Sequence, residues 1–224
     1  MNEHSFILPG YGSAEQAHMA SSTARKLAVV RPATGGDKRD AILRAATKVF
    51  AQRGFFQSQV ADVARVAGVA AGTVYLYFKG KDDLLVSIFE RSMGEVLADG
   101  RAAVDGIADP VERLRRLAHL HLGRLGRDRD LAVVFQVELR QSVKFMERFS
   151  ESFLQDYFKL IRQAIADGQQ RGAFRKDLSA TTATKIFFGA LDEMATNWVL
   201  SRRKYDLSAE ADAVVDLFIH GVKR

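Results

Sequence analysis

Residues 60–85 decide the fold of this chain and read VADVARVAGVAAGTVYLYFKGKDDLL. Apolar residues such as Val60 and Ala64 recur there at helical spacing, and Gly68 follows where a left-handed residue would end a helix. A second short helix is predicted directly afterwards, over residues 71–78. Small residues stand where the two segments meet, so the helices can cross closely. This arrangement is typical of a helix-turn-helix whose second helix enters the major groove of DNA.

The second segment carries the chemistry expected at a DNA surface. Thr73, Tyr75 and Tyr77 bear hydroxyl groups, and lysines follow them. Hydroxyl and ammonium groups are usual donors to phosphate oxygens. Val74 and Phe78, four positions apart, are predicted to face the core instead. The residues expected to contact DNA are Lys38, Ser58, Gln59, Ala71, Gly72, Thr73, Tyr75, Leu76, Tyr77 and Lys81.

Two side chains are predicted to cap the helices of this region. Ser58 precedes the first helix of the pair, and its hydroxyl can accept a hydrogen bond from a free backbone N–H of the first turn. Asp37 has the same predicted role for an amphipathic helix over residues 38–53, which Gly54 would end. That helix is expected to support the pair as the third helix of the domain.

Many positions between residues 50 and 85 follow one family pattern: Phe50, Gly54, Phe55, Ser58, Val60, Asp62, Val63, Ala64, Ala67, Gly68, Val69, Gly72, Thr73, Val74, Tyr75, Tyr77, Phe78, Lys81, Leu84 and Leu85. The pattern resembles the N-terminal DNA-binding domain of the TetR family of repressors. The family commonly has a serine where this chain has Ala70. The alanine removes an N-cap worth about 1 kcal/mol and one possible phosphate donor.

The net charge of +6 lies in one segment of the 224 residues. Between Arg25 and Arg53 there are eight Lys or Arg against two Asp, which equals the whole surplus. A charge run usually marks a solvated face. Because this run adjoins the helix-turn-helix, we expect it to face phosphates.

Several classes of protein are excluded by what the sequence lacks. There is no cysteine, which fits a cytoplasmic protein and removes disulfides and thiolate metal sites. No apolar run is long enough to cross a membrane, and no secretory signal begins the sequence. His119 and His121 would diverge on a helix, and no HExxH, GxSxG or phosphate-loop pattern occurs. We therefore expect neither an enzyme nor a metal or cofactor site.

The chain divides into three predicted parts, and the fold class is all-α. Residues 1–36 are a predicted flexible extension, acting either as a basic arm on DNA or as an inert leader. Residues 37–82 are the three-helix DNA-binding domain, and residues 83–224 form a helical ligand-binding and dimerisation bundle. Further helices are predicted over 82–100, from Asp109-Pro110 to Leu125, and over 131–140, 142–171, 179–201 and 208–222.

Aromatic and apolar residues of the second domain could line a tube that holds an acyl chain, where each buried methylene contributes roughly 0.8 kcal/mol. For any single residue, ordinary core packing is the better explanation. The predicted ligand-binding residues are Phe89, Met93, Leu97, Phe135, Leu139, Arg140, Phe149, Phe153, Phe187 and Leu191.

Residues 131–142 (LAVVFQVELRQS), 188–193 (FGALDE), Trp198-Val199 and 204–207 (KYDL) resemble the fatty-acid-degradation regulator branch of the family. The resemblance implies a repressor of β-oxidation genes that long-chain acyl-CoA releases from its operator. Two roles for Arg140 stay open. Its guanidinium would either bind the phosphates of CoA or pair with Glu138 or another acid. The run Arg202-Arg203-Lys204 is either another phosphate contact or a solvated surface.

The last two predicted helices are expected to form a homodimer, because a two-fold dimer reads a palindromic operator. The predicted interface residues are Ala195, Trp198, Val199, Val214, Leu217 and Phe218. Two other functions are weighed. One is a TetR-type repressor of an efflux pump that senses drug-like aromatic molecules. The other is a helical lipid-binding protein with no DNA role, against which the concentrated charge of the N-terminal segment argues.

Overall fold

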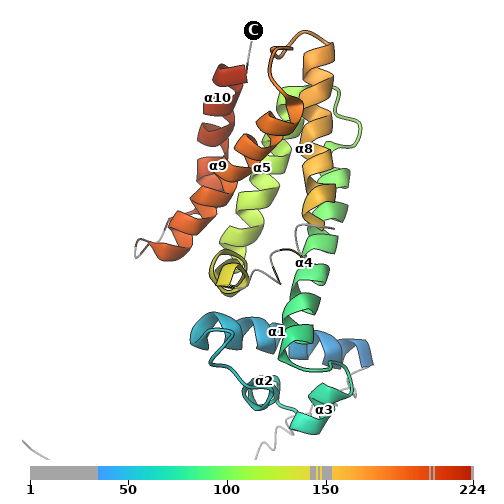
Figure 1. The fold of residues 1–224 in the computed structure, drawn as a ribbon, viewed down its shortest axis with the longest axis vertical. Helices are drawn as coiled ribbons and strands as arrows, with labels where there is room; N and C mark the ends of the chain where they lie inside the picture. The colour runs from blue at the N-terminus through green and yellow to red at the C-terminus, as the bar shows by residue number, and fades with distance from the viewer. Residues whose placement is uncertain are drawn as a thin grey trace, which may run out of the picture. The chain divides into compact units, whose positions relative to one another are not determined.

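The computed structural model describes residues 35–141, 145, 147, 153–201, 203 and 205–222. The elements in this part of the chain are all helices, which confirms the predicted all-α fold (Figure 1). The predicted extension up to residue 34, the ligand candidate Phe149, and Arg202 and Lys204 lie outside the described residues. No helix of the described part is long and apolar enough to cross a membrane.

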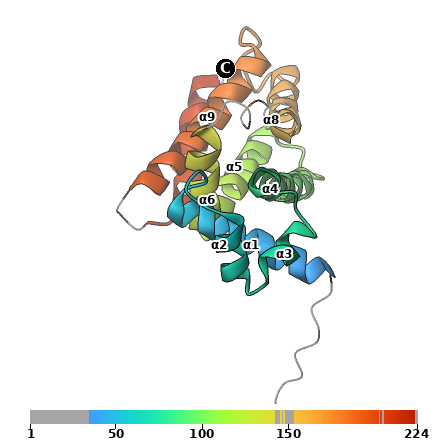
Figure 2. The ribbon, with the colours of Figure 1, turned by 60° about the horizontal axis from the view of Figure 1, so that its bottom comes forward.

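Three helices form the N-terminal domain: α1 (Gly35–Arg53), α2 (Val60–Ala67) and α3 (Ala71–Tyr75). Their apolar faces meet in one core, in which Phe50, Val63 and Val74 are almost completely buried. Gly68 has φ 69° and ends α2, as its position predicts. In both views the three helices lie together beside the N-terminal end of α4 (Figure 1 and Figure 2).

Three predicted details of this domain are wrong. Helix α1 begins at Gly35, so residues 35 and 36 are helical and Asp37 lies in the first turn rather than at the N-cap. The N-cap of α2 is Gln59 and not Ser58. Helix α3 ends at Tyr75, before the predicted limit, and the chain continues to Phe78 in a turn.

Helix α4 (Lys81–Val104) leads out of this domain into the second one (Figure 1). Helix α5 (Pro110–Arg127) begins as predicted, with the Asp109 carboxylate accepting a hydrogen bond from the Val111 N–H. Helix α6 (Arg129–Val133) then continues into a π-helical segment, η1 (Val134–Glu138), and a 3₁₀ turn, η2 (Leu139–Gln141). Short π-helical segments are rare and often occur at functional sites.

The chain is completed by α8 (Phe153–Gln170), α9 (Ala180–Leu200), the 3₁₀ turn η3 (Leu207–Glu210) and α10 (Ala211–Val222). Gly172 has φ 76° just after α8, and the Ser179 hydroxyl caps α9 by accepting from the Thr182 N–H. Helices α4, α5, α8 and α9 enclose a second core that includes Leu117, Ile161 and Phe187.

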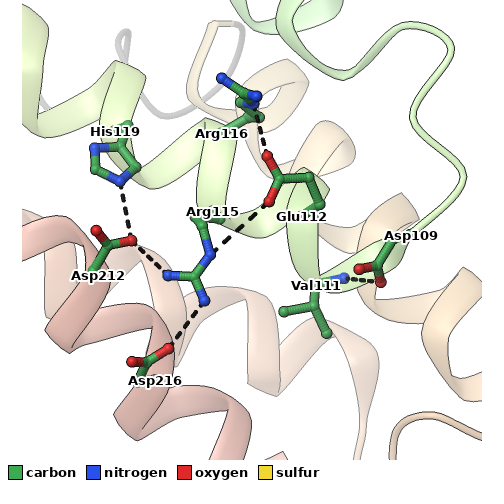
Figure 3. A network of polar contacts seen from close by, with 8 residues as sticks. All are labelled: Asp109, Val111, Glu112, Arg115, Arg116, His119, Asp212 and Asp216. Carbon is green, nitrogen blue, oxygen red and sulfur yellow. Dashed lines mark hydrogen bonds and ion pairs between the residues drawn. The ribbon is translucent and has the colours of Figure 1, made fainter.

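A polar network joins α5 to α10 at the surface (Figure 3). The Arg115 guanidinium contacts Asp212 at 2.5 Å and Asp216 at 3.0 Å, and the ring Nε2 of His119 lies 3.1 Å from Asp212. Hydrogen bonds from Arg115 and His119 hold the pKa of Asp212 below its ordinary value. Because these groups are exposed, the network orients α10 on α5 more than it stabilises the fold.

Candidate functional site

The start of α2 is held by a polar cluster around Asp62. Its carboxylate accepts a hydrogen bond from the Gln59 N–H at 3.1 Å and pairs with Arg53 of α1 at 2.6 Å and Arg65 at 2.9 Å. The Gln59 hydrogen bond, followed by that of Arg65, lowers the pKa of Asp62. The cluster therefore fixes α2 against α1 and orients the helix pair.

Two residues predicted to contact DNA make hydrogen bonds within the domain. Ser58 is buried, and its hydroxyl donates to the Gly54 carbonyl at 2.6 Å. Lys81 Nζ donates to the carbonyls of Phe56 and Ser58 at 3.1 Å each and lies 4.6 Å from the centre of the Phe55 ring. The Ser58 side chain is thus withdrawn from any DNA surface, and the Lys81 ammonium holds the turn before α2.

The remaining DNA candidates lie at the start of α1, just before α2, and in α3 and the turn after it, and all are at least partly exposed. Tyr75 is 58% exposed and Leu76 is 81% exposed, whereas Val74 and Phe78 are buried as predicted. Lys38, Gln59, Ala71 and Gly72 are exposed as well, and Thr73 and Tyr77 are half-buried. Leu76 is the C-cap residue of α3, so its exposed side chain lies at the end of that helix, next to the exposed Tyr75.

The second candidate site is a cavity of about 240 Å³ in the C-terminal domain. Helices α4, α5, α8 and α9 and the η1–η2 segment all contribute to its wall. The lining is mostly apolar, with a few polar groups, which is the usual composition of a ligand site. The lining residues are Ser92, Met93, Val96, His121, Arg124, Leu125, Phe135, Gln136, Leu139, Arg140, Leu154, Tyr157, Phe188 and Asp192.

The predicted ligand residues separate into three groups. Met93, Phe135, Leu139 and Arg140 line the cavity. Phe89 packs behind the wall, with its ring centre 4.5 Å from that of Phe135. The predicted residues Leu97, Phe187 and Leu191 are buried in the core and do not line the cavity, and their contact with a ligand stays a prediction. Phe153 begins α8, but its side chain is outside the described part of the structure.

A polar cluster centred on Asp192 occupies one side of the cavity. The Asp192 carboxylate accepts from Arg140 at 2.5 Å and from the Gln136 amide at 3.0 Å, and the Thr196 hydroxyl donates to Gln136 at 2.9 Å. Arg140 therefore pairs with an acid, as one of the two alternatives held, but the acid is Asp192 and not Glu138. Arg140 remains 41% exposed, so its guanidinium can still reach a second anion.

His121 is one of the cavity-lining residues that the sequence does not single out as a ligand contact. Its ring packs against those of Tyr157 and Phe188, at centroid distances of 5.8 and 5.6 Å, and it lines the cavity. Its Nε2 atom is shielded from solvent and has no hydrogen-bond partner among the described residues. Burial lowers the pKa of His121 to about 4, so the ring is neutral at pH 7. Burial likewise raises the pKa of Tyr157.

Most of the predicted dimer residues belong to the core of a single chain. Ala195, Trp198, Val199 and Val214 are buried, so their side chains are not exposed to a partner. Trp198 is held from within: its indole N–H donates to the Tyr205 carbonyl at 2.9 Å, and the Arg129 guanidinium lies 4.7 Å above its ring. Leu217 is 78% exposed and Phe218 is half-buried against Phe187, at 4.9 Å between rings.

The described residues contain no group of three side chains suited to hold a metal ion. Among them, the candidate sites are therefore a protruding helix-turn-helix surface and an apolar cavity with a polar side.

Two family models match the chain in succession. "Bacterial regulatory proteins, tetR family" matches residues 42–88, and "YsiA-like protein, C-terminal region" matches residues 89–221. The fatty acid metabolism regulator protein of Bacillus subtilis is 36% identical over 181 residues, which are 81% of this chain and 93% of that protein.

Two solved structures are similar over most of their length. The fatty acid degradation regulator FadR from Bacillus halodurans aligns with a TM-score of 0.79 and 38% identity, covering 84% of this chain and 97% of its own. The FadR regulator of Bacillus subtilis in complex with stearoyl-CoA aligns with a TM-score of 0.77 and 36% identity, covering 81% of this chain and 98% of its own.

Proposed function

This chain belongs to the TetR family of bacterial regulatory proteins, and we propose that it represses fatty-acid degradation genes until a long-chain fatty acyl-CoA releases it from its operator. As a member of this family it is a DNA-binding transcriptional regulator and not an enzyme. The observation that carries the proposal is the apolar cavity with an Asp192-centred polar side. A relative of 36% identity has been solved with stearoyl-CoA.

The proposed division of labour follows the two sites. Residues 37–82 bind DNA through Lys38, Gln59 and the exposed surface of residues 71–77, and residues 83–224 bind the ligand and dimerise. Leu217 and Phe218 of α10 are the proposed contacts with a second copy of the chain. A dimer presents two such DNA-binding surfaces to a palindromic operator in the cytoplasm.

The size of the cavity suggests how the ligand acts. Pockets for small ligands are usually about 300–1,000 Å³, and the cavity of about 240 Å³ lies below that range. A long acyl chain therefore needs a conformation in which the helices around the cavity stand further apart. A ligand that binds this conformation more tightly shifts the population toward it, and DNA is released if that conformation misplaces α3.

The direct test is operator binding by fluorescence anisotropy on duplex DNA from upstream of the chain's own gene. Palmitoyl-CoA, palmitate and CoA are titrated separately. Release by palmitoyl-CoA supports the proposal. Binding of palmitoyl-CoA without any change in operator affinity would refute the release mechanism. If none of the three compounds releases the protein from the operator, acyl-CoA is not the ligand, and the alternative of drug-like aromatic ligands is favoured.

A matched pair of variants ties the response to the cavity. Val96 and Val104 are half-buried valines on α4, and Val96 lines the cavity whereas Val104 does not. Val96→Trp fills the cavity and should raise the concentration of palmitoyl-CoA needed for release. Val104→Trp should leave that concentration close to the wild-type value.

A further inference from the structure

The wall of the ligand cavity contains a polar atom to which the described residues offer no partner. This atom is Nε2 of His121, on α5, and it is shielded from solvent. The ring packs against the rings of Tyr157 and Phe188, which hold it in place. A buried polar atom without a partner costs free energy, and a ligand that supplies the partner removes that cost. His121 is therefore a position at which the cavity can distinguish one ligand from another.

A carboxylate lies close to this ring. Phe188 and Asp192 are four residues apart on α9, so they share one face of that helix, and both line the cavity. Burial lowers the pKa of His121, and the Asp192 carboxylate is near enough to act against that effect. Each Asp192 oxygen accepts one hydrogen bond, from Gln136 or from Arg140. Because a carboxylate oxygen can accept more than one, Asp192 can also accept from a ligand.

A hydroxyl group matches these two partners. In one tautomer of the neutral imidazole, Nε2–H donates to the hydroxyl oxygen, which can donate its own hydrogen to the Asp192 carboxylate. In the other tautomer, Nε2 of His121 accepts from the hydroxyl. A ketone accepts hydrogen bonds but donates none, and a methylene does neither. A saturated acyl chain would therefore cover Nε2 without pairing it.

We infer that His121 and Asp192 form a binding site for a hydroxyl group on the acyl chain, so that the protein prefers hydroxylated to saturated long-chain acyl-CoA. This inference rests on the proposed function and adds a chemical requirement inside the cavity. The apolar part of the wall holds the methylenes on either side of the hydroxyl. A site built to hydrogen-bond a hydroxyl discriminates against the analogue that lacks it, because the polar groups of the site are then left unpaired.

The test compares wild type with His121→Phe and His121→Gln in the full chain. Phenylalanine keeps an aromatic ring beside Tyr157 and Phe188 and removes both ring nitrogens, whereas glutamine keeps a hydrogen-bonding group. His119→Phe is the matched control, since His119 is an exposed histidine of the same helix. Thermal melting of each variant checks the fold.

Calorimetry without DNA measures the binding of palmitoyl-CoA and of its 3-hydroxy, 10-hydroxy and 16-hydroxy derivatives. These compounds place the hydroxyl near each end and in the middle of the acyl chain. The oxo analogue of the most tightly bound hydroxy derivative is measured as well, because it keeps the oxygen and loses the donor.

We expect wild type to bind one hydroxy derivative more tightly than palmitoyl-CoA, and this preference to fall about tenfold in His121→Phe. His121→Gln should retain part of the preference, and His119→Phe should retain all of it. The oxo analogue should bind more weakly than the hydroxy compound, because it cannot donate to Asp192.

Two results would overturn the inference while leaving the proposed function intact. One is that wild type shows no preference for any hydroxy derivative, and the other is a preference of the same size in wild type and in His121→Phe. An oxo analogue that binds as tightly as the hydroxy compound would overturn the assignment of Asp192. Wild type that binds none of the acyl-CoA compounds would refute the proposed function itself.

Discussion

The carboxylate of Glu138 accepts a hydrogen bond from the backbone N–H of Phe55 at 2.6 Å, although the two residues are 83 positions apart. Phe55 lies in the turn between α1 and α2, and Glu138 ends the π-helical segment η1. Phe135 and Gln136 of the same segment line the cavity. One short segment thus touches both the ligand site and the DNA-binding domain, which makes it a direct physical connection between them.

Glu138→Ala is expected to weaken this connection. Glu138 is only 6% exposed, so its loss leaves the Phe55 N–H buried without an acceptor. The free energy of unfolding should fall by about 1–3 kcal/mol, as measured by urea denaturation. The ratio of operator affinities with and without palmitoyl-CoA should also move toward one. Glu138→Gln, which retains an acceptor oxygen, is the control and should recover most of both properties.

Ala70→Ser tests the missing cap of the recognition helix. Ala70 precedes α3 with an extended backbone (φ −67°, ψ 148°), which is the conformation of an N-cap residue, and its side chain makes no cap hydrogen bond. A serine hydroxyl there can accept from the first turn of α3 and should stabilise the domain by about 1 kcal/mol. The free energy of unfolding, measured by urea denaturation, and the operator affinity should both increase. Ala71→Ser, one position inside the helix, is the matched control for stability and should not raise the free energy of unfolding.

Local rules account for the features that the sequence predicts correctly. Gly68 ends α2 because a left-handed residue is needed there, and the four-residue spacing of Val74 and Phe78 identifies a buried face. The N-cap of α2 lies one residue later than predicted, since Ser58 and Gln59 both have oxygen acceptors and only the turn geometry decides between them.

Long-range relationships decide what helical periodicity leaves open. Helical periodicity shows that Leu97, Phe187 and Leu191 are buried, but it does not distinguish a packed core from the wall of a cavity. Trp198 belongs to the last two helices, which are predicted to form the dimer, but it is buried within the single chain. Arg129, which is 69 positions away in sequence, lies 4.7 Å from the Trp198 ring and donates to the Trp198 carbonyl at 3.3 Å.

His121 should make the protein sensitive to acid. Burial lowers its pKa from 6.5 to about 4 in the folded protein, so the unfolded chain binds a proton in the interval between these values and the folded chain does not. The contribution to stability is present above pH 6.5 and is lost as the pH falls toward 4. Between pH 7 and pH 5 it amounts to about 2 kcal/mol.

His121→Phe keeps an aromatic ring beside Tyr157 and Phe188 but removes the titrating group. Urea denaturation at pH 7 and pH 5 should therefore show a smaller loss of stability in this variant than in wild type. His119→Phe removes an exposed histidine of the same helix and is the control. Equal acid sensitivity of wild type and His121→Phe would mean that other groups, such as the carboxylates, dominate the response.

Leu217→Arg tests the proposed dimer surface. Leu217 is 78% exposed on α10, so an arginine there should change the stability of the single chain little. At a two-fold interface, the same arginine would be buried next to the arginine of the second copy and would destabilise the dimer. We expect the variant to sediment as a monomer with an unchanged melting temperature in dilute solution. It should bind a palindromic operator much more weakly, because a single chain contacts only one half-site. Leu76→Arg is the control, since Leu76 is 81% exposed but lies beside α3. It should change operator binding without changing the sedimentation of the free protein, and a Leu217→Arg protein that sediments like wild type would place the dimer contact on another surface.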